Sequence, residues 1–377
     1  MNKPKILVTS DTYYPLMDGV LKFLEEFIKR SRGSFDISFL VPKLTTKRIK
    51  GIKTIFYPVS KRFKASIYPV PRLSFKNLRK IKETIKDSEL VFAHGPGLVG
   101  FFLSLRYARK YGKKNVLYIH NTAWDFLDKY LTLRKISFKL LKKYFVKFYN
   151  KWDMLIVPYS DVKKQLRREG IRTNIQVAKL GVDINKFLPS KNLNRSKKKL
   201  KLPDKIVVGY VGRICREKNT LVLLEAFKRL DPDKFFLLMV GDGNPDIVKE
   251  FKEYKNCKIT GFVEDVEGYL QAMDAFVMPS LTETTSLATL EAMSCGLPVI
   301  VSKVGYMKEY IKRDHNGLFF PRTNPAVLAL KIEKLFKDDH LREKIGRNAR
   351  KTVAYAFSWE RSINKIKRIL LKFYYSG

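Results

Sequence analysis

The sequence predicts an α/β protein built from two doubly wound domains. Short apolar runs alternate with segments of helical periodicity along the chain, which is typical of parallel sheets covered by helices on both faces. The chain has 377 residues, too many for one ordinary core, and this suggests two domains of roughly 150 to 200 residues. A lysine-rich stretch without apolar periodicity is the predicted linker. We therefore expect a first domain at 1–190, a linker at 191–204, a second domain at 205–356 and a terminal segment at 357–377.

The first domain opens with a predicted strand, a loop containing Gly19, and a helix. A single glycine there would let the backbone approach a phosphate closely, although one glycine in a turn is more often structural. Two histidines, His94 and His120, follow later predicted strands. A histidine at the end of a strand is usually structural as well, so the residues alone assign neither a role. The predicted strands of this domain are Lys5–Thr9, Ile37–Val41, Thr54–Val59, Leu90–Ala93, Val116–Ile119 and Met154–Val157.

Two cations follow the first predicted strand of the second domain, Lys205–Val211. Arg213 and Lys218 lie five positions apart on a loop between this strand and a helix. Together they could clamp a diphosphate, because arginine supplies a bidentate fork and lysine a point charge. In so basic a chain, the alternative is a solvated pair.

The stretch 279–300 reads as a strand end, a polar turn, a helix, a terminating glycine and another strand. Glu283 and Glu291 lie eight positions apart, which in a helix is a rise of about 12 Å and a return to nearly the same face. Glu283 would therefore lie at the mouth of the predicted helix and Glu291 about two turns into it. Both carboxylates would face the carboxyl ends of the strands, where open α/β sheets bind ligands. The amides of Thr284, Thr285 and Ser286 would suit an anion. The alternative is an ordinary strand-helix-strand unit with solvated glutamates.

The composition indicates an anionic partner. Seventy-five basic and 36 acidic side chains give a formal net charge of +39, which fits nucleic acid, an acidic membrane or phosphorylated substrates. Three scattered cysteines show no metal-ligand spacing and favour a reducing compartment. We expect no signal peptide and no transmembrane span, since the amino terminus runs directly into a strand and no apolar run reaches 18 residues.

Residues 130–151 combine aromatic and basic residues with no acidic residue. On a helical wheel, one side carries five lysines and another carries Phe138, Leu141, Tyr144, Phe145 and Phe148. This pattern fits an interfacial helix that meets anionic headgroups through its lysines. The alternative is a helix packed on the core with a solvated basic face. The whole-chain charge favours the membrane, and the lysines concerned are Lys135, Lys139, Lys142, Lys143 and Lys147.

The stretch 279–300 resembles the Glu-x7-Glu signature of the family 4 retaining glycosyltransferases. Gly212-Arg213-x4-Lys218 resembles that family's Gly-Arg-x4-Lys element, and Gly181-Val182-Asp183 with Phe187 resembles its domain-junction segment. The ending from Phe357 resembles the family's last helix, which crosses back to the first domain. The resemblance covers essentially the whole chain and implies the GT-B architecture, with two Rossmann-like domains facing a cleft.

The resemblance also implies roles for individual residues. Glu291 would bind the ribose hydroxyls of a nucleotide-sugar, and Glu283, with the amides after it, would hold the sugar. Arg213 and Lys218 would bind the diphosphate without a metal, and Gly19 would lie against the donor diphosphate or the acceptor. Family members commonly carry a histidine beside the donor sugar, and that role falls on His120. One departure concerns Ser286, because many relatives have glycine there.

The implied reaction is transfer of a hexose, with retention, from a donor such as UDP-glucose or GDP-mannose. The basic segment favours a membrane-lipid acceptor, such as a diacylglycerol, a phosphoinositide or an isoprenoid-linked sugar. It also favours a cytoplasmic enzyme on the inner face of the membrane. The first alternative is a polysaccharide or lipopolysaccharide-core transferase. The remote alternative, a nucleic-acid-binding protein, rests on the charge alone, since we find no nucleic-acid-binding module in the sequence.

Overall fold

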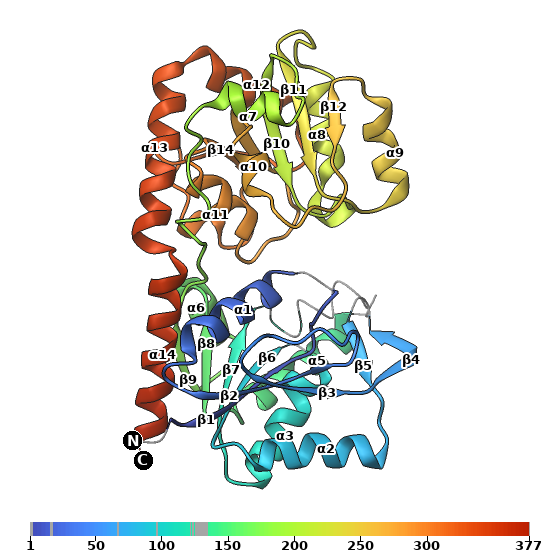
Figure 1. Cartoon of the computed structure of the whole chain (residues 1–377), viewed down its shortest axis with the longest axis vertical. Helices are drawn as coiled ribbons and strands as arrows, with labels where there is room; N and C mark the ends of the chain where they lie inside the picture. The colour runs from blue at the N-terminus through green and yellow to red at the C-terminus, as the bar shows by residue number, and fades with distance from the viewer. Residues whose placement is uncertain are drawn as a thin grey trace. The chain divides into compact units, whose positions relative to one another are not determined.

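The computed structural model describes residues 3–15, 18–65, 68–95, 97–120, 122, 124 and 135–376, with the backbone alone for 61–65, 68 and 135–138 (Figure 1). The chain divides into two compact units. Unit 1 comprises residues 1–180 and 362–377, and unit 2 comprises residues 181–361. No helix in the described part of the chain is long and apolar enough to cross a membrane.

Unit 1 contains a seven-stranded parallel sheet in the order β3-β2-β1-β6-β7-β8-β9. The direction in which strands are added reverses between β1 and β6, so their carboxyl ends form the switch point at which such sheets bind ligands. A separate antiparallel pair, β4 (Val59–Ala65) and β5 (Tyr68–Pro71), was not predicted. The sheet strands are β1 (Lys5–Ser10), β2 (Asp36–Pro42), β3 (Lys53–Tyr57), β6 (Leu90–Gly95), β7 (Lys114–Ile119), β8 (Met154–Val157) and β9 (Asn174–Val177).

The helices of unit 1 follow the strands as expected of a doubly wound sheet (Figure 1). Helix α1 buries an apolar face and carries Asp18 as its N-cap, with the carboxylate accepting the Leu21 amide. A π-helical segment, η1, follows β6 and runs directly into α3. The helices are α1 (Gly19–Ser31), α2 (Phe75–Lys86), η1 (Leu98–Leu103), α3 (Ser104–Lys110), α5 (Lys135–Tyr149) and α6 (Ser160–Arg168).

Unit 2 contains a six-stranded parallel sheet in the order β12-β11-β10-β13-β14-β15. Its switch point lies between β10 and β13, and the loops after these strands carry most of the predicted site. The strands are β10 (Ile206–Val211), β11 (Phe235–Val240), β12 (Cys257–Ile259), β13 (Ala275–Met278), β14 (Val299–Ser302) and β15 (Leu318–Phe320). The helices are α7 (Leu193–Lys199), η2 (Arg216–Lys218), α8 (Thr220–Phe227), α9 (Pro245–Glu253), α10 (Glu267–Leu270), α11 (Leu287–Ser294), η3 (Met307–Glu309), α12 (Pro325–Lys337) and α13 (Asp339–Ala356).

The division between the units differs from the predicted boundaries. It falls after Leu180, and residues 191–204 belong to unit 2 instead of forming a linker. Their lysine-rich stretch contains helix α7, in which the buried Lys197 places its ammonium 2.7 Å from the Asp274 carboxylate. A stretch that looks polar in sequence is therefore held by a buried ion pair.

The last helix, α14 (Trp359–Tyr375), contributes its residues from Ser362 onward to unit 1. The Ser362 hydroxyl donates to the Lys179 carbonyl. The Lys114 ammonium donates to the carbonyls of Phe373 and Tyr374, at 2.9 and 2.8 Å, which satisfies acceptors left open at the end of the helix.

Candidate functional site

Lys218 and Glu283 come together at the switch point of unit 2. Lys218 ends the short helix η2 after β10, and Glu283 lies in the loop after β13. The Lys218 ammonium lies 2.6 Å from Oε1 of Glu283, and their side chains are 18% and 9% exposed. A cation and a carboxylate predicted from segments 65 positions apart thus form one partly buried pair.

The loop that holds Glu283 is fixed by two serines and a glycine. The Ser280 hydroxyl donates to Glu283 Oε1 at 2.9 Å, and the Ser302 hydroxyl donates to the Ser280 carbonyl at 2.6 Å. At Gly305, whose φ is +55°, a Cβ atom would lie 1.7 Å from the Glu283 carbonyl oxygen. Only glycine therefore allows this close approach of the two backbones.

Arg213 has a more exposed position than Lys218. Its side chain is 57% exposed and lies 3.5 Å from the Glu217 carboxylate, which is at most a weak surface ion pair. Its backbone is well fixed, because the buried Tyr210 hydroxyl donates to the Arg213 carbonyl at 2.8 Å. A Cβ at Gly241 would lie 2.1 Å from the Gly212 carbonyl oxygen, so the loops after β10 and β11 touch directly.

Helix α11 begins later than the sequence suggested. Its first residue is Leu287, and Ser286 is the N-cap, with its hydroxyl accepting the Thr289 amide at 3.3 Å. Glu291 therefore lies about one turn into the helix, not two, and is buried. Thr284 and Thr285 precede the helix, and the buried Thr285 hydroxyl has no hydrogen-bond partner among the described residues. An unsatisfied buried hydroxyl at a helix amino terminus is a candidate ligand contact.

In unit 1, the predicted site residue His120 forms a buried pair with His94. Nδ1 of His94 lies 3.0 Å from Nε2 of His120, and both rings lie against Phe23. Burial lowers the pKa of His120 to about 3. Burial and, second, the neighbouring His120 hold the pKa of His94 well below its usual value. Both rings are therefore neutral at pH 7, and His94, which the residues alone left structural, is the direct partner of His120.

Asp11 is a buried carboxylate that was not among the site residues predicted from the sequence. It follows β1 at the switch point of unit 1 and accepts the amides of Val99 and Gly100, at 3.0 and 2.7 Å, at the start of η1. The Tyr57 hydroxyl donates to it at 3.1 Å. Burial raises the pKa of Asp11 to about 6, although these three hydrogen bonds favour the ionised form. Its place directly after the first predicted strand was the available signal.

Gly19 is the first residue of α1, with its helix capped by Asp18, and not part of a preceding loop. The Asp18 carboxylate also accepts a hydrogen bond from the Thr12 hydroxyl at 3.2 Å. Gly19 is exposed at this helix amino terminus, in the same unit as His120.

The predicted membrane helix is partly a core helix. On α5, Phe145 is buried, and the Phe148 ring lies 4.9 and 4.8 Å from those of Phe101 and Phe102 in η1. Lys142 pairs with Glu169 at 2.6 Å. The exposed face instead combines two apolar side chains with three lysines, and the side chain of Lys135 lies outside the described residues. The exposed residues are Lys139, Leu140, Lys143, Tyr144 and Lys147.

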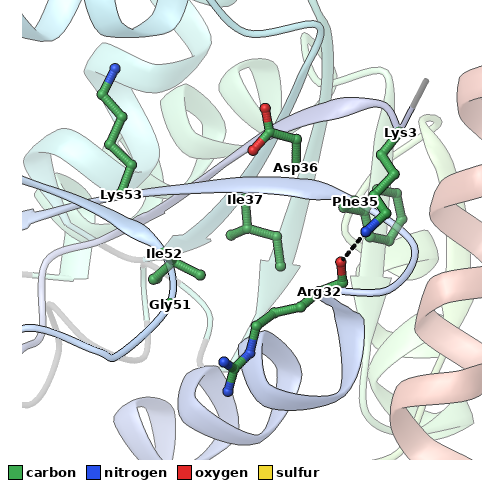
Figure 2. A pocket seen from close by; sticks show the side chains of 8 residues that line it. All are labelled: Lys3, Arg32, Phe35, Asp36, Ile37, Gly51, Ile52 and Lys53. Atoms are coloured by element: carbon green, nitrogen blue, oxygen red, sulfur yellow. Dashed lines mark hydrogen bonds between the residues drawn. The ribbon is translucent and has the colours of Figure 1, made fainter.

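Two hollows in unit 1 and one in unit 2 are lined by none of the predicted site residues. One of about 580 Å³ opens at the amino ends of β1–β3 in unit 1. Figure 2 shows that its cations, Lys3, Arg32 and Lys53, point in different directions, with Lys3 donating to the Arg32 carbonyl. They do not converge on one anion, and parallel sheets bind ligands at the opposite, carboxyl ends.

Two family models match the chain and identify its family. Residues 19–186 match the model described as Glycosyltransferase Family 4, and residues 192–352 match Glycosyl transferases group 1. The chain belongs to glycosyltransferase family 4. The fold of this family 4 enzyme is GT-B. Anabaena HepE in complex with UDP matches it with a TM-score of 0.81 at 19% identity, over 98% of this chain and all of that one. Thermosynechococcus elongatus sucrose-phosphate synthase matches with a TM-score of 0.83 at 19% identity, over the full length of both chains.

One relative of known activity is similar to this family 4 enzyme along nearly its whole length, at a higher sequence identity than the two solved structures. It is the Escherichia coli UDP-Gal:alpha-D-GlcNAc-diphosphoundecaprenol alpha-1,3-galactosyltransferase, 26% identical over 97% of each chain. The similarity therefore extends across both units and is not confined to the nucleotide-sugar motifs of unit 2.

Proposed function

We propose that this enzyme transfers a hexose from a UDP-sugar, with retention of configuration, to a lipid-linked sugar at a membrane surface. The observation that carries the proposal is the end-to-end similarity to a UDP-galactose-dependent enzyme that acts on a diphosphoundecaprenol-linked sugar. HepE, the solved structure with UDP, supports the choice of UDP over GDP. Of the acceptors considered from the sequence, an isoprenoid-linked sugar is the one this relative supports.

Within this proposal, each part of the donor is assigned to residues of unit 2. Lys218 and the exposed Arg213 supply positive charge for the diphosphate, so that charge developing on the leaving group is stabilised without a metal. The Thr284–Ser286 amides and the unsatisfied Thr285 hydroxyl lie at the start of α11, where an anion is favoured. Glu291 binds the ribose hydroxyls, and Glu283 holds the sugar ring.

Lys218 and Glu283 neutralise each other before the donor arrives. A diphosphate that takes the Lys218 ammonium frees the Glu283 carboxylate to accept hydrogen bonds from the sugar hydroxyls. His120, neutral because it is buried, provides an uncharged hydrogen-bonding group for the sugar or acceptor. The leaving phosphate assists deprotonation of the acceptor, as front-face retention requires.

The exposed face of α5 supports a membrane location for the acceptor. Lys139, Lys143 and Lys147 would meet anionic headgroups, each contributing about 1 kcal/mol. Leu140 and Tyr144, 64% and 54% exposed, lie between them and could enter the interface. This location is the inner face of the cytoplasmic membrane, where nucleotide-sugars are available.

A thermal-shift screen with UDP, GDP, ADP and their sugar conjugates tests the donor assignment. We expect stabilisation by UDP and by one UDP-sugar, unchanged by a metal chelator. Stabilisation by GDP alone would replace the donor, and stabilisation only by RNA or DNA would favour the nucleic-acid-binding alternative. The anomeric configuration of the product, measured by NMR, tests retention.

A further inference from the structure

The turn between β5 and α2 exposes two large apolar side chains. Leu73 is 64% exposed and Phe75 is 84% exposed, and Phe75 is the most exposed large apolar residue in the described part of the chain. Single exposed apolar residues are common on protein surfaces and need no explanation. Leu73 and Phe75, however, lie on either side of Ser74, the N-cap of α2, and together form a distinct apolar surface feature. We refer to Arg72–Lys76 as the α2 turn.

The α2 turn is held rigidly by hydrogen bonds. The Ser74 hydroxyl accepts the Asn77 amide at 3.3 Å as the N-cap of α2. The buried Asn77 side chain donates to the carbonyls of Arg72, at 2.7 Å, and Pro58, at 3.3 Å. Leu73 and Phe75 are therefore presented outward by a fixed backbone, so little conformational entropy would be lost when they bind a partner.

The charged residues that flank the α2 turn in the sequence are all basic. Between positions 37 and 82 the sequence has 13 lysines and arginines and no aspartate or glutamate. Arg72, Lys76, Arg79 and Lys80 are exposed. None of these four forms an ion pair with a carboxylate among the described residues, while the Lys80 ammonium donates to the Phe56 carbonyl. An apolar tip surrounded by cations complements an anionic bilayer, whose headgroups attract the charge and whose interior accepts the side chains.

We propose that the α2 turn is a membrane anchor, in which Leu73 and Phe75 enter the interface of an anionic bilayer while Arg72 and Lys76 meet its headgroups. It would act as a second contact beside the exposed face of α5. The two lie in the same unit, because β5 contacts η1 and the Phe102 ring of η1 packs 4.8 Å from Phe148 of α5. A nucleic acid fits this surface less well, because the exposed Leu73 side chain can form neither an ion pair nor a hydrogen bond with a phosphate backbone.

The exposed face of α5 and the α2 turn would contribute to membrane binding in ways that respond differently to salt. The α5 lysines contribute attraction that salt screens, because the Debye length falls to about 3 Å at 1 M ionic strength. Insertion of Leu73 and Phe75 contributes apolar burial, which salt does not screen. The anchor therefore predicts a component of membrane binding that persists in high salt and depends on these two residues.

The test is sedimentation with sucrose-loaded vesicles of phosphatidylglycerol and phosphatidylcholine, at low and high salt. We expect the double variant Leu73→Ser, Phe75→Ser to bind about tenfold or more weakly at high salt, from the area that two such side chains would bury. The matched control is Leu330→Ser with Tyr355→Ser in unit 2, where these residues are 62% and 73% exposed. Equal binding by the two double variants at high salt would overturn the proposal.

A spectroscopic measurement keeps the proposal testable if affinity changes little. In Phe75→Trp, quenching of fluorescence by lipids brominated on their acyl chains should exceed that of the wild type. The three tryptophans of the wild type, Trp124, Trp152 and Trp359, are all buried. The absence of added quenching would contradict insertion. Insertion would also be contradicted if RNA released the protein from vesicles and the Leu73→Ser, Phe75→Ser variant lost RNA binding. Vesicle binding needs no donor, so a failure here leaves UDP-dependent transfer standing, and a failure of transfer leaves the anchor standing.

Discussion

The Lys218 ammonium lies 2.6 Å from Oε1 of Glu283, and the pair bridges the two loops at the switch point of unit 2. Ser280 donates to the same carboxylate oxygen. Lys218, the cation assigned to the diphosphate, and Glu283, the carboxylate assigned to the sugar, are thus in direct contact. It explains how two charged groups can remain largely buried before any ligand arrives.

Replacing Lys218 by Met should destabilise the protein and weaken UDP binding. Glu283 would keep its charge in a largely buried position without its cation, which costs about 1–3 kcal/mol. In urea unfolding, the double variant Lys218→Met, Glu283→Gln should be less destabilised than Lys218→Met alone. The single variant Glu283→Gln completes the cycle. If the destabilisation of the double variant equals the sum of those of Lys218→Met and Glu283→Gln, the pair contributes no coupling energy and our description of it is wrong.

Gly305→Ala should reduce donor binding without contacting the donor. The new methyl group would lie 1.7 Å from the Glu283 carbonyl oxygen, so the loop carrying Glu283 must move. Gly268→Ala is the matched control, because no atom lies within 4 Å of the methyl group it would introduce. We expect the UDP-sugar Kd to rise about tenfold or more in Gly305→Ala, about 1.4 kcal/mol, and to stay unchanged in the control. An unchanged Kd in both would remove the Glu283 loop from the site.

The histidine pair should lower stability as the pH falls below about 6.5. The pKa of His94 and of His120 is depressed in the folded state, His120 to about 3, so only the unfolded chain takes up their protons between these values. Each histidine then removes about 1.4 kcal/mol per pH unit. Asp11 acts oppositely, because its pKa is raised to about 6 and the folded state gains its proton first.

Urea unfolding at pH 7.5 and 5.0 measures this balance. The two histidines should lower stability at pH 5.0, and they are opposed by Asp11, Glu25 and Asp153, whose pKa values burial raises. The variant His120→Asn should lose less stability between the two pH values than the wild type. Equal losses would show that the histidine pair does not titrate as its burial implies.

The α5 lysines should carry the salt-sensitive part of membrane binding. Lys139→Ser, Lys143→Ser and Lys147→Ser together should weaken binding to anionic vesicles at low salt by about 3 kcal/mol. The control changes three exposed lysines of unit 2 in the same way, Lys198, Lys199 and Lys201. The UDP-induced thermal shift should be the same in both. Equal vesicle binding by the two triple variants would return α5 to the alternative of a core helix with a solvated face.

The sequence predicted what depends on local pattern. The strand β13, the loop with Glu283 and the cations after β10 each carry a short-range signal, and the structure has them at the switch point. The predicted depth of Glu291 in α11 was wrong, because the Ser286 cap starts the helix only at Leu287.

Contacts between distant segments were beyond local pattern. The carboxylate of Asp11 binds amides about 90 positions away, and His94 meets His120 only because β6 and β7 are neighbours in the sheet. The same holds for α5, where Phe145 and Phe148 pack on Phe101 and Phe102 of η1 instead of facing a bilayer. Periodicity shows that a face is apolar but not what covers it.

The measurement that tests the central claim most directly is transfer of radiolabelled sugar from UDP-sugars to a diphosphoprenol-linked N-acetylglucosamine in vesicles. We expect a labelled, longer lipid-linked product with one UDP-sugar, lost in Glu291→Gln and retained in the exposed-surface control Glu250→Gln. If no UDP-sugar labels the lipid while a soluble polysaccharide fragment is labelled, the lipid acceptor is wrong. If Glu291→Gln transfers as well as the wild type, the assigned donor site is wrong.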